Sequence, residues 1–118
     1  MTNQLKETIA KQTRFMPNLA HLLCDDIAED KFANRFDTTI NHPAFILGHI
    51  SYYAGICVEI LGGETVFEDG EAELFKIGVS CTDDAQNYPD KETLLARFKA
   101  RCESSAAFIE SCDLEVLE

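Results

Sequence analysis

The side chains in this sequence that could bind a metal ion or move a proton include three histidines, His21, His42 and His49. His42 and His49 are seven residues apart, so on one helix they share a face but lie about 10 Å apart along the axis. That separation prevents both imidazoles from binding one ion, and neither HExxH nor HxxxH occurs. The spacing alone therefore favours His49 as a core histidine, hydrogen-bonded to a neighbouring helix, to Tyr52 or to Tyr53.

The sequence shows no other arrangement that is typical of a catalytic site. It has no GxSxG motif, no CxxC pair and no cysteine next to a histidine. The acidic pairs at 25–26, 68–69 and 83–84 lie in loop-like stretches, where we expect water to surround them. The first 15 residues lack the apolar core of a signal peptide, so we expect a cytoplasmic protein with reduced thiols. Most of these thiols should fill the core; they are Cys24, Cys57, Cys81, Cys102 and Cys112.

Composition predicts one folded domain that spans residues 1–118. The chain is 46% apolar, which is ordinary for a globular protein, and its net charge is −11. Only 10 basic residues are present, so we expect neither a nucleic-acid partner nor binding to an anionic membrane. The apolar run at 43–61 is nearly long enough to span a bilayer. Because Pro43, His49 and Glu59 interrupt it and no basic residue flanks it closely, a buried soluble helix is favoured.

Helical spacing of apolar residues predicts three long helices. The first segment covers residues 3–33, with a kink or break near 13–16 because Pro17 lacks an N–H. Its helix should end within residues 24–36, which should also hold a short turn and a further helical turn. The second covers 43–61, with Asn41 as a cap and two glycines as the stop. A long crossover with a short helix at 71–77 follows, and the third helix begins after a cap by Asp90. The expected inner positions of the first helix are Leu5, Ile9, Met16, Leu19, Leu23 and Ile27, and those of the third are Leu94 or Leu95, Phe98, Cys102, Ser105 or Ala106, and Ile109.

The second helix is apolar on most sides, which predicts a place in the middle of a bundle. Gly48 and Gly55 are one heptad apart and should allow other helices to approach closely. On the third helix we expect Arg97, Lys99 and Arg101 to face water. One stripe of the second helix comprises Ile46, Ile50, Tyr53, Cys57 and Ile60 or Leu61, and the other comprises Phe45, His49, Tyr52 and Ile56.

The fold class expected is an all-α bundle of three helices whose apolar surface exceeds what they cover among themselves. Either a fourth helix comes from elsewhere or the chain dimerises. The last residues still include Leu114, Val116 and Leu117 without a stop signal. We therefore expect the domain to be incomplete at its C-terminus.

Two stretches resemble one known family. NHPAFILGHISYYAGICVEILGG, residues 41–63, resembles the second helix of the DinB/YfiT-like superfamily, an apolar run with a Gly-His pair and a glycine stop. ELFKIGVSCTDDAQNYPDKETLLARFKA, residues 73–100, looks like the family's crossover into its third helix. The resemblance covers nearly the whole chain and is strongest at about 41–100. It implies a DinB-like four-helix bundle, commonly dimeric, with the fourth helix here missing or supplied by a partner.

The resemblance also implies a divalent metal, such as nickel or zinc, held by three histidines. His49 matches the ligand from the second helix, whereas His21 and His42 match no ligand position. The other two ligands would form a His-x-x-x-His pair on the fourth helix, and this sequence contains no such pair. The implied activity is transfer of a small-molecule thiol to an electrophile, or a related isomerase or hydrolase reaction. The alternative is a non-catalytic bundle that dimerises or binds a partner or apolar ligand, and we expect a homodimer.

Overall fold

The computed structural model of the protein describes residues 3–112, in which all regular secondary structure is helical and no strand occurs. This confirms the expected all-α class. The long helices are α1 (Asn3–Cys24), α3 (Pro43–Ile60) and α5 (Lys91–Ser111). The short ones are α2 (Glu29–Phe32), α4 (Glu71–Phe75) and the 3-10 turn η1 (Ala85–Asn87). The apolar residues at 114, 116 and 117, and the question of a further helix after them, lie outside the described residues.

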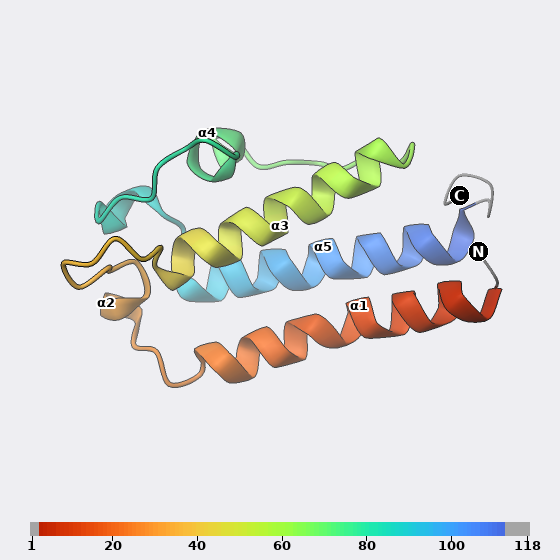
Figure 1. Ribbon diagram of the computed structural model, residues 1–118, viewed down its shortest axis with the longest axis horizontal. Helices are drawn as coiled ribbons and strands as arrows, with labels where there is room; N and C mark the ends of the chain where they lie inside the picture. The colour runs from red at the N-terminus through yellow and green to blue at the C-terminus, as the bar shows by residue number, and fades with distance from the viewer. Residues whose placement is uncertain (1–2, 113–118) are drawn as a thin grey trace.

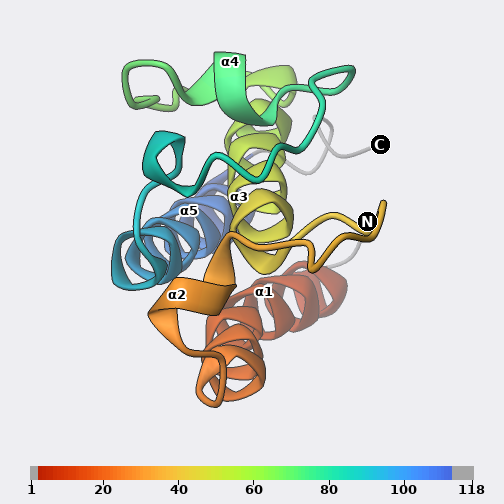
Figure 2. The same cartoon turned by 90° about the vertical axis from the view of Figure 1, so that its left-hand side faces the viewer.

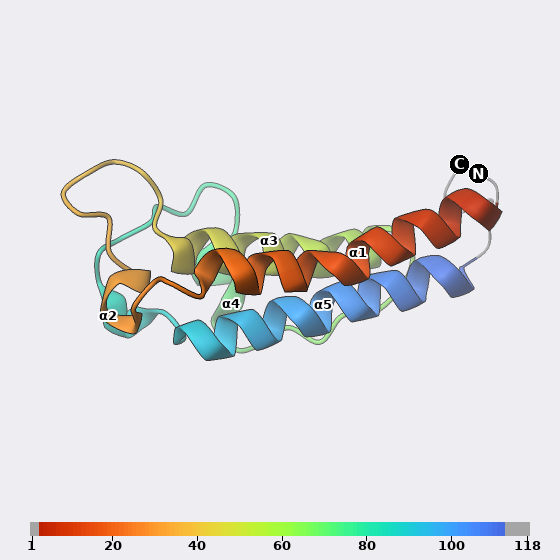
Figure 3. The same cartoon turned by 90° about the horizontal axis from the view of Figure 1, so that it is seen from below.

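The three long helices lie side by side, with α5 shared by the other two (Figure 1). α3 and α5 run in the same direction and α1 runs in the opposite one, which requires the long crossover between α3 and α5. Viewed from the end, α1 and α3 each pack on α5 and hardly touch each other (Figure 2). α4 and the rest of the crossover cover a different side of α3. The side of α1 and α3 that faces away from α5 therefore stays open (Figures 2 and 3).

The inner surface of α1 differs from the prediction. Its buried positions are Lys6, Ala10, Pro17 and Cys24, which share the side that faces α5. Small side chains there let the two helices approach closely, as ridges-into-grooves packing allows. The larger residues predicted to be inside are exposed instead: Leu5 is 47%, Met16 46%, Leu19 39% and Leu23 68% exposed. α1 also runs unbroken through Pro17, so the predicted break does not occur.

The ends of α3 follow local rules. His42, rather than the predicted Asn41, is the N-cap: its Nδ1 accepts a hydrogen bond from the Phe45 N–H at 3.1 Å. The helix stops where Gly62 adopts φ 98°, a left-handed conformation that favours glycine. The Gly62 N–H donates to the Glu59 carbonyl and the Gly63 N–H to the Val58 carbonyl, which is the Schellman arrangement. The predicted glycine stop is therefore confirmed.

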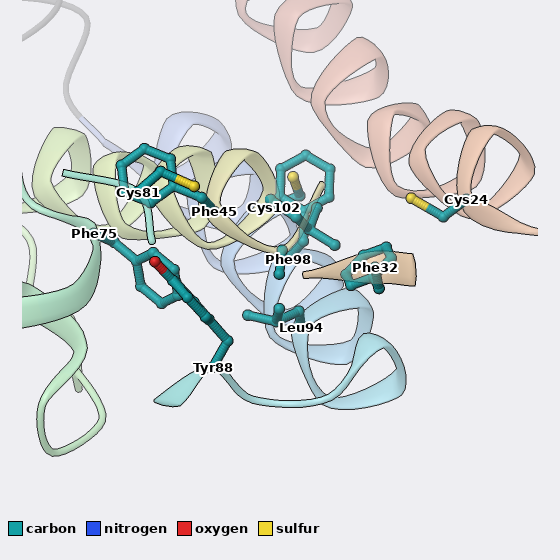
Figure 4. Packing of buried hydrophobic residues seen from close by; sticks show 11 residues of the cluster. Cys24, Phe32, Phe45, Phe75, Cys81, Tyr88, Leu94, Phe98 and Cys102 are labelled. Carbon is teal, nitrogen blue, oxygen red and sulfur yellow. The ribbon is translucent and has the colours of Figure 1, made fainter. Parts of the chain in front are cut away.

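The main core lies at the end of the bundle where α2 and the crossover meet α3 and α5 (Figure 4). Gly48 faces the ring of Phe75 there, and a Cβ at position 48 would lie 2.2 Å from that ring. Gly55 in the same way faces Phe67 and Thr65. Gly48 thus allows the close approach of another helix, as predicted, although that helix is the short α4. Gly55 instead admits side chains of the segment that precedes α4. The larger side chains of this core are Phe32, Phe45, Phe75, Tyr88, Leu94 and Phe98.

α5 confirms most of its predicted pattern. The Thr93 N–H donates to the Asp90 carboxylate at 2.7 Å, so Asp90 is the cap, and the predicted inner residues Leu94, Phe98, Cys102 and Ala106 are buried. Arg101, predicted to face water, is only 6% exposed and therefore belongs to the interior. α3 is long and apolar enough to be a candidate membrane span. It packs on α5 and the crossover, as the core helix of a soluble protein does.

Candidate functional site

His49 lies on α3 where the helix meets α4, and its side chain is half-buried. Its Nδ1 is 2.7 Å from the main-chain carbonyl oxygen of Phe75. Because a carbonyl can only accept, Nδ1 carries the hydrogen and donates it. Nε2 has no hydrogen-bond partner among residues 3–112 and is not sealed from solvent. The ring is therefore held in one tautomer, with Nε2 as the available nitrogen.

Two aromatic side chains fix the orientation of this imidazole. The ring of Phe45 stacks on it with centroids 5.7 Å apart and an interplanar angle of 19°. The ring of Tyr53 lies 4.9 Å away on the next turn, and its hydroxyl accepts a hydrogen bond from the Ile77 N–H at 2.8 Å. The prediction that His49 bonds to a neighbouring helix is thus confirmed, whereas neither Tyr52 nor Tyr53 is its hydrogen-bond partner. Its partner is a main-chain carbonyl of α4.

A surface cavity of about 260 Å³ opens beside His49. Its walls come from the first two turns of α3 and from the crossover segment that follows α4. Its polar side chains belong to Asn41, His49 and Lys76. The remaining lining residues are Phe45, Ile46, Ile50, Ile77, Gly78 and Val79.

The three histidines do not form one site. His42 is 2% exposed and uses both nitrogens: Nδ1 caps α3, and Nε2–H donates to the Thr82 carbonyl at 2.8 Å. His21 is exposed on α1, in a groove that α1 forms with α5. Within residues 3–112 no group of three His, Cys, Asp or Glu side chains is placed to hold a metal ion. His49 is therefore a single potential ligand in the described part of the chain.

Sequence reasoning missed a buried ion pair between Glu71 on α4 and Arg101 on α5. Arg101 Nη2 lies 2.6 Å from Glu71 Oε1 and Nη1 lies 2.9 Å from Oε2. Nη1 also donates to the Ser51 carbonyl at 3.0 Å, and the guanidinium sits over the Phe67 ring. Burial alone would raise the pKa of Glu71, but the hydrogen bonds from Arg101 and from the Glu68 N–H hold it below its usual range.

All five cysteines are unpaired in the structure. Burial raises the pKa of Cys24 and raises that of Cys102 to about 11, so neither thiol is readily ionised. Cys57 differs because it is exposed. It lies on the open side of α3 and lines no cavity together with His49.

Two apolar stripes flank the open side of the molecule. On α1, exposed apolar residues recur at intervals of three and four, and on α3 they do so from Ile46 to Ile60. On each helix the stripe lies roughly a third to a half of a turn from the buried residues, and together the two stripes form an exposed apolar surface. We call this surface the α1/α3 face. It consists of Met16, Leu19, Leu23, Ile46, Ile50, Cys57 and Ile60.

No protein-family model, curated protein sequence or solved structure matches the chain. The small all-helical domain is a finding of the structure itself, whereas the DinB-like resemblance rests on the sequence motifs.

Proposed function

We propose that the protein is a DinB-like helical bundle that serves as an assembly domain and binds a further helical surface on its α1/α3 face. A bundle helix ordinarily packs against two neighbours that lie on different sides of it. α1 has α5 as its one long neighbour, whereas α3 packs on α5 and on the short helix α4. The α1/α3 face is where a further neighbour of both long helices would lie, and its exposed apolar residues are the observation that carries the proposal.

The chain itself supplies that cover, as a homodimer in which the α1/α3 faces of two copies meet. The face presents on the order of 600 Å² of apolar side chain, close to what each partner buries in the smaller specific interfaces. No acidic residue lies within either stripe, although the chain has 21 of them. Two copies with a net charge of −11 can therefore meet through this face without placing like charges opposite each other. A two-fold axis would set α1 and α3 against the same helices of the partner.

Sedimentation velocity over a series of concentrations tests this assembly. We expect a dimer that dissociates on dilution, and a monomer when Ile50 in the face is replaced by glutamate. Val66→Glu is the control, because Val66 is 89% exposed but lies on the crossover outside the face. A wild-type chain that stays monomeric at high micromolar concentration would overturn the proposal.

A second candidate function is the metal-dependent thiol transfer that the DinB-like motifs imply. It is favoured by one observation, the hydrogen bond from His49 Nδ1–H to the Phe75 carbonyl. Metal-binding histidines usually donate their second ring N–H in this way, which orients the ligating nitrogen. The described residues do not by themselves fit a nickel or zinc ion, because they offer one ligand where such sites use three or four. The missing ligands would have to come from outside the described residues.

Metal analysis separates this candidate from the assembly function. Protein dialysed against nickel or zinc and then against buffer is assayed for bound metal by mass spectrometry. If His49 is a ligand, His49→Gln should lose the metal that the wild type retains, and His21→Gln should keep it because His21 is exposed elsewhere on α1. Equal retention by both variants would remove His49 from the candidate site, without affecting the assembly proposal.

A further inference from the structure

We infer that the cavity beside His49 binds a small branched organic acid that carries a hydroxyl or amino group next to its carboxylate. The inference rests on the charge, the hydrogen-bonding groups and the size of this cavity. It does not depend on a metal ion, and its cavity shares Ile46 and Ile50 with the α1/α3 face.

The charge of the cavity wall is unusual for this protein. None of the acidic residues that the structure describes lines the cavity, whereas each of four other surface cavities includes at least one aspartate or glutamate. The cavity is instead lined by Lys76, which forms no ion pair with any described residue, and by Asn41. A carboxylate is the group that such a wall attracts in an otherwise acidic molecule.

The imidazole adds a second requirement. Since Nδ1–H donates to the Phe75 carbonyl, the neutral ring offers Nε2 as an acceptor. A simple carboxylate has no hydrogen to give it. A hydroxyl or amino group on the carbon next to the carboxylate supplies that donor, while the carboxylate itself reaches Lys76. Phe45 and Tyr53 hold the ring in place, so the acceptor is positioned before a ligand arrives.

The apolar residues that line the cavity determine the shape and size of the rest of the ligand. Ile46 and Ile50 of α3 face Ile77 and Val79 of the crossover across the cavity, so a branched aliphatic chain would be buried between them. The cavity is open to solvent and has a volume of about 260 Å³, which is enough for roughly nine non-hydrogen atoms if each takes up the space of one water. A six-carbon 2-hydroxy acid has this size.

Isothermal titration calorimetry with three related compounds tests the inference, in the presence of EDTA so that no metal ion bridges protein and ligand. The compounds are 2-hydroxy-4-methylpentanoate, its amide, and 4-methylpentanoate, which lacks the hydroxyl. We expect the hydroxy acid to bind most tightly and each of the other two to bind roughly tenfold more weakly, the loss typical of one charge-assisted hydrogen bond. Equal binding of all three, or no binding of the hydroxy acid, would overturn the inference.

Two matched variants locate the binding. Lys76→Gln should lower the affinity for the hydroxy acid roughly tenfold. Lys99→Gln should leave that affinity unchanged, because Lys99 lines a different groove between α1 and α5. Equal affinities for both variants would place the binding elsewhere and contradict the inference. The same titration on Leu23→Glu separates the ligand inference from the assembly proposal. If this variant binds the hydroxy acid, even as a monomer, the result supports the ligand site. If the variant loses only the dimer, the result bears on assembly and not on the ligand site.

Discussion

Glu71 and Arg101 form a two-armed ion pair that joins α4 to α5 across 30 residues of sequence, and both side chains are buried. The arginine also binds the carbonyl of Ser51 on α3, so one guanidinium connects the crossover to two long helices. The Glu68 N–H donates to Glu71 Oε1 at 2.9 Å and completes the carboxylate's partners. The pair therefore fixes the crossover that carries Phe75, and Phe75 in turn holds His49.

Breaking this pair should destabilise the fold severely. Arg101→Met leaves the Glu71 carboxylate buried without its partner, which typically costs about 3–5 kcal/mol. Urea unfolding followed by circular dichroism measures the loss. Arg14→Met is the control, because Arg14 pairs with Glu103 and Glu110 at the surface and its removal should leave the urea midpoint nearly unchanged. Equal midpoints for the two variants would show that the buried pair does not lock the crossover.

The same pair should make stability depend on acid. The folded protein holds the pKa of Glu71 below its usual range, so the stabilisation is complete above the unfolded pKa of about 4.3 and is lost as pH falls through the folded value. Wild-type protein should therefore lose stability on acidification below about pH 4.3 more steeply than Glu71→Gln, which cannot titrate there. Urea unfolding at several pH values checks the slopes, and parallel slopes would contradict the assignment.

Gly48 should not tolerate a methyl group. At an exposed helix position, replacing Gly by Ala raises the free energy of unfolding by about 1 kcal/mol. At position 48, however, the added Cβ would lie 2.2 Å from the Phe75 ring. We expect Gly48→Ala to lower the free energy of unfolding by roughly 1–3 kcal/mol. In a Phe75→Leu background the same change should cost less, because the ring edge is gone. Thermal melts of the four proteins measure the coupling, and additive effects would contradict the contact.

Cys57 provides a chemical probe of the α1/α3 face. It is the exposed cysteine of the chain, so a maleimide should label it first, ahead of the buried thiols. If a second copy covers the face, labelling should slow as protein concentration rises. Leu23→Glu should remove the dependence of the labelling rate on protein concentration. Cys57→Ser measures the background labelling, which comes from Cys112. A labelling rate independent of concentration in the wild type would argue against the dimer.

Local signals accounted for much of the fold. The Asp90 cap and the glycine stop after α3 depend on residues a few positions apart, and both could be predicted from spacing. The packing of α1 could not. Helical periodicity identifies an apolar stripe, but it does not say which stripe meets which helix. On α1 the small residues Ala10 and Cys24 pack on α5 and leave the larger stripe outside.

The candidate site was less predictable because its contacts join distant segments. His49 bonds to a main-chain carbonyl 26 residues away, and any residue type supplies such an acceptor. Arg101 looked like a surface residue because its partner, Glu71, comes from a short helix in the crossover. Lys76 gave no sequence signal at all, and only the fold places it beside His49.

The most direct test of the account uses two neighbouring leucines of α1. Leu22 and Leu23 are 71% and 68% exposed, but helix geometry directs them about 100° apart, so that Leu23 lies in the α1/α3 face and Leu22 outside it. Sedimentation velocity is measured for Leu22→Glu, Leu23→Glu and the wild type, after circular dichroism shows equal helix content. We predict dimers for the wild type and Leu22→Glu and a monomer for Leu23→Glu. Identical sedimentation of the two variants would contradict the proposal that this face assembles the protein.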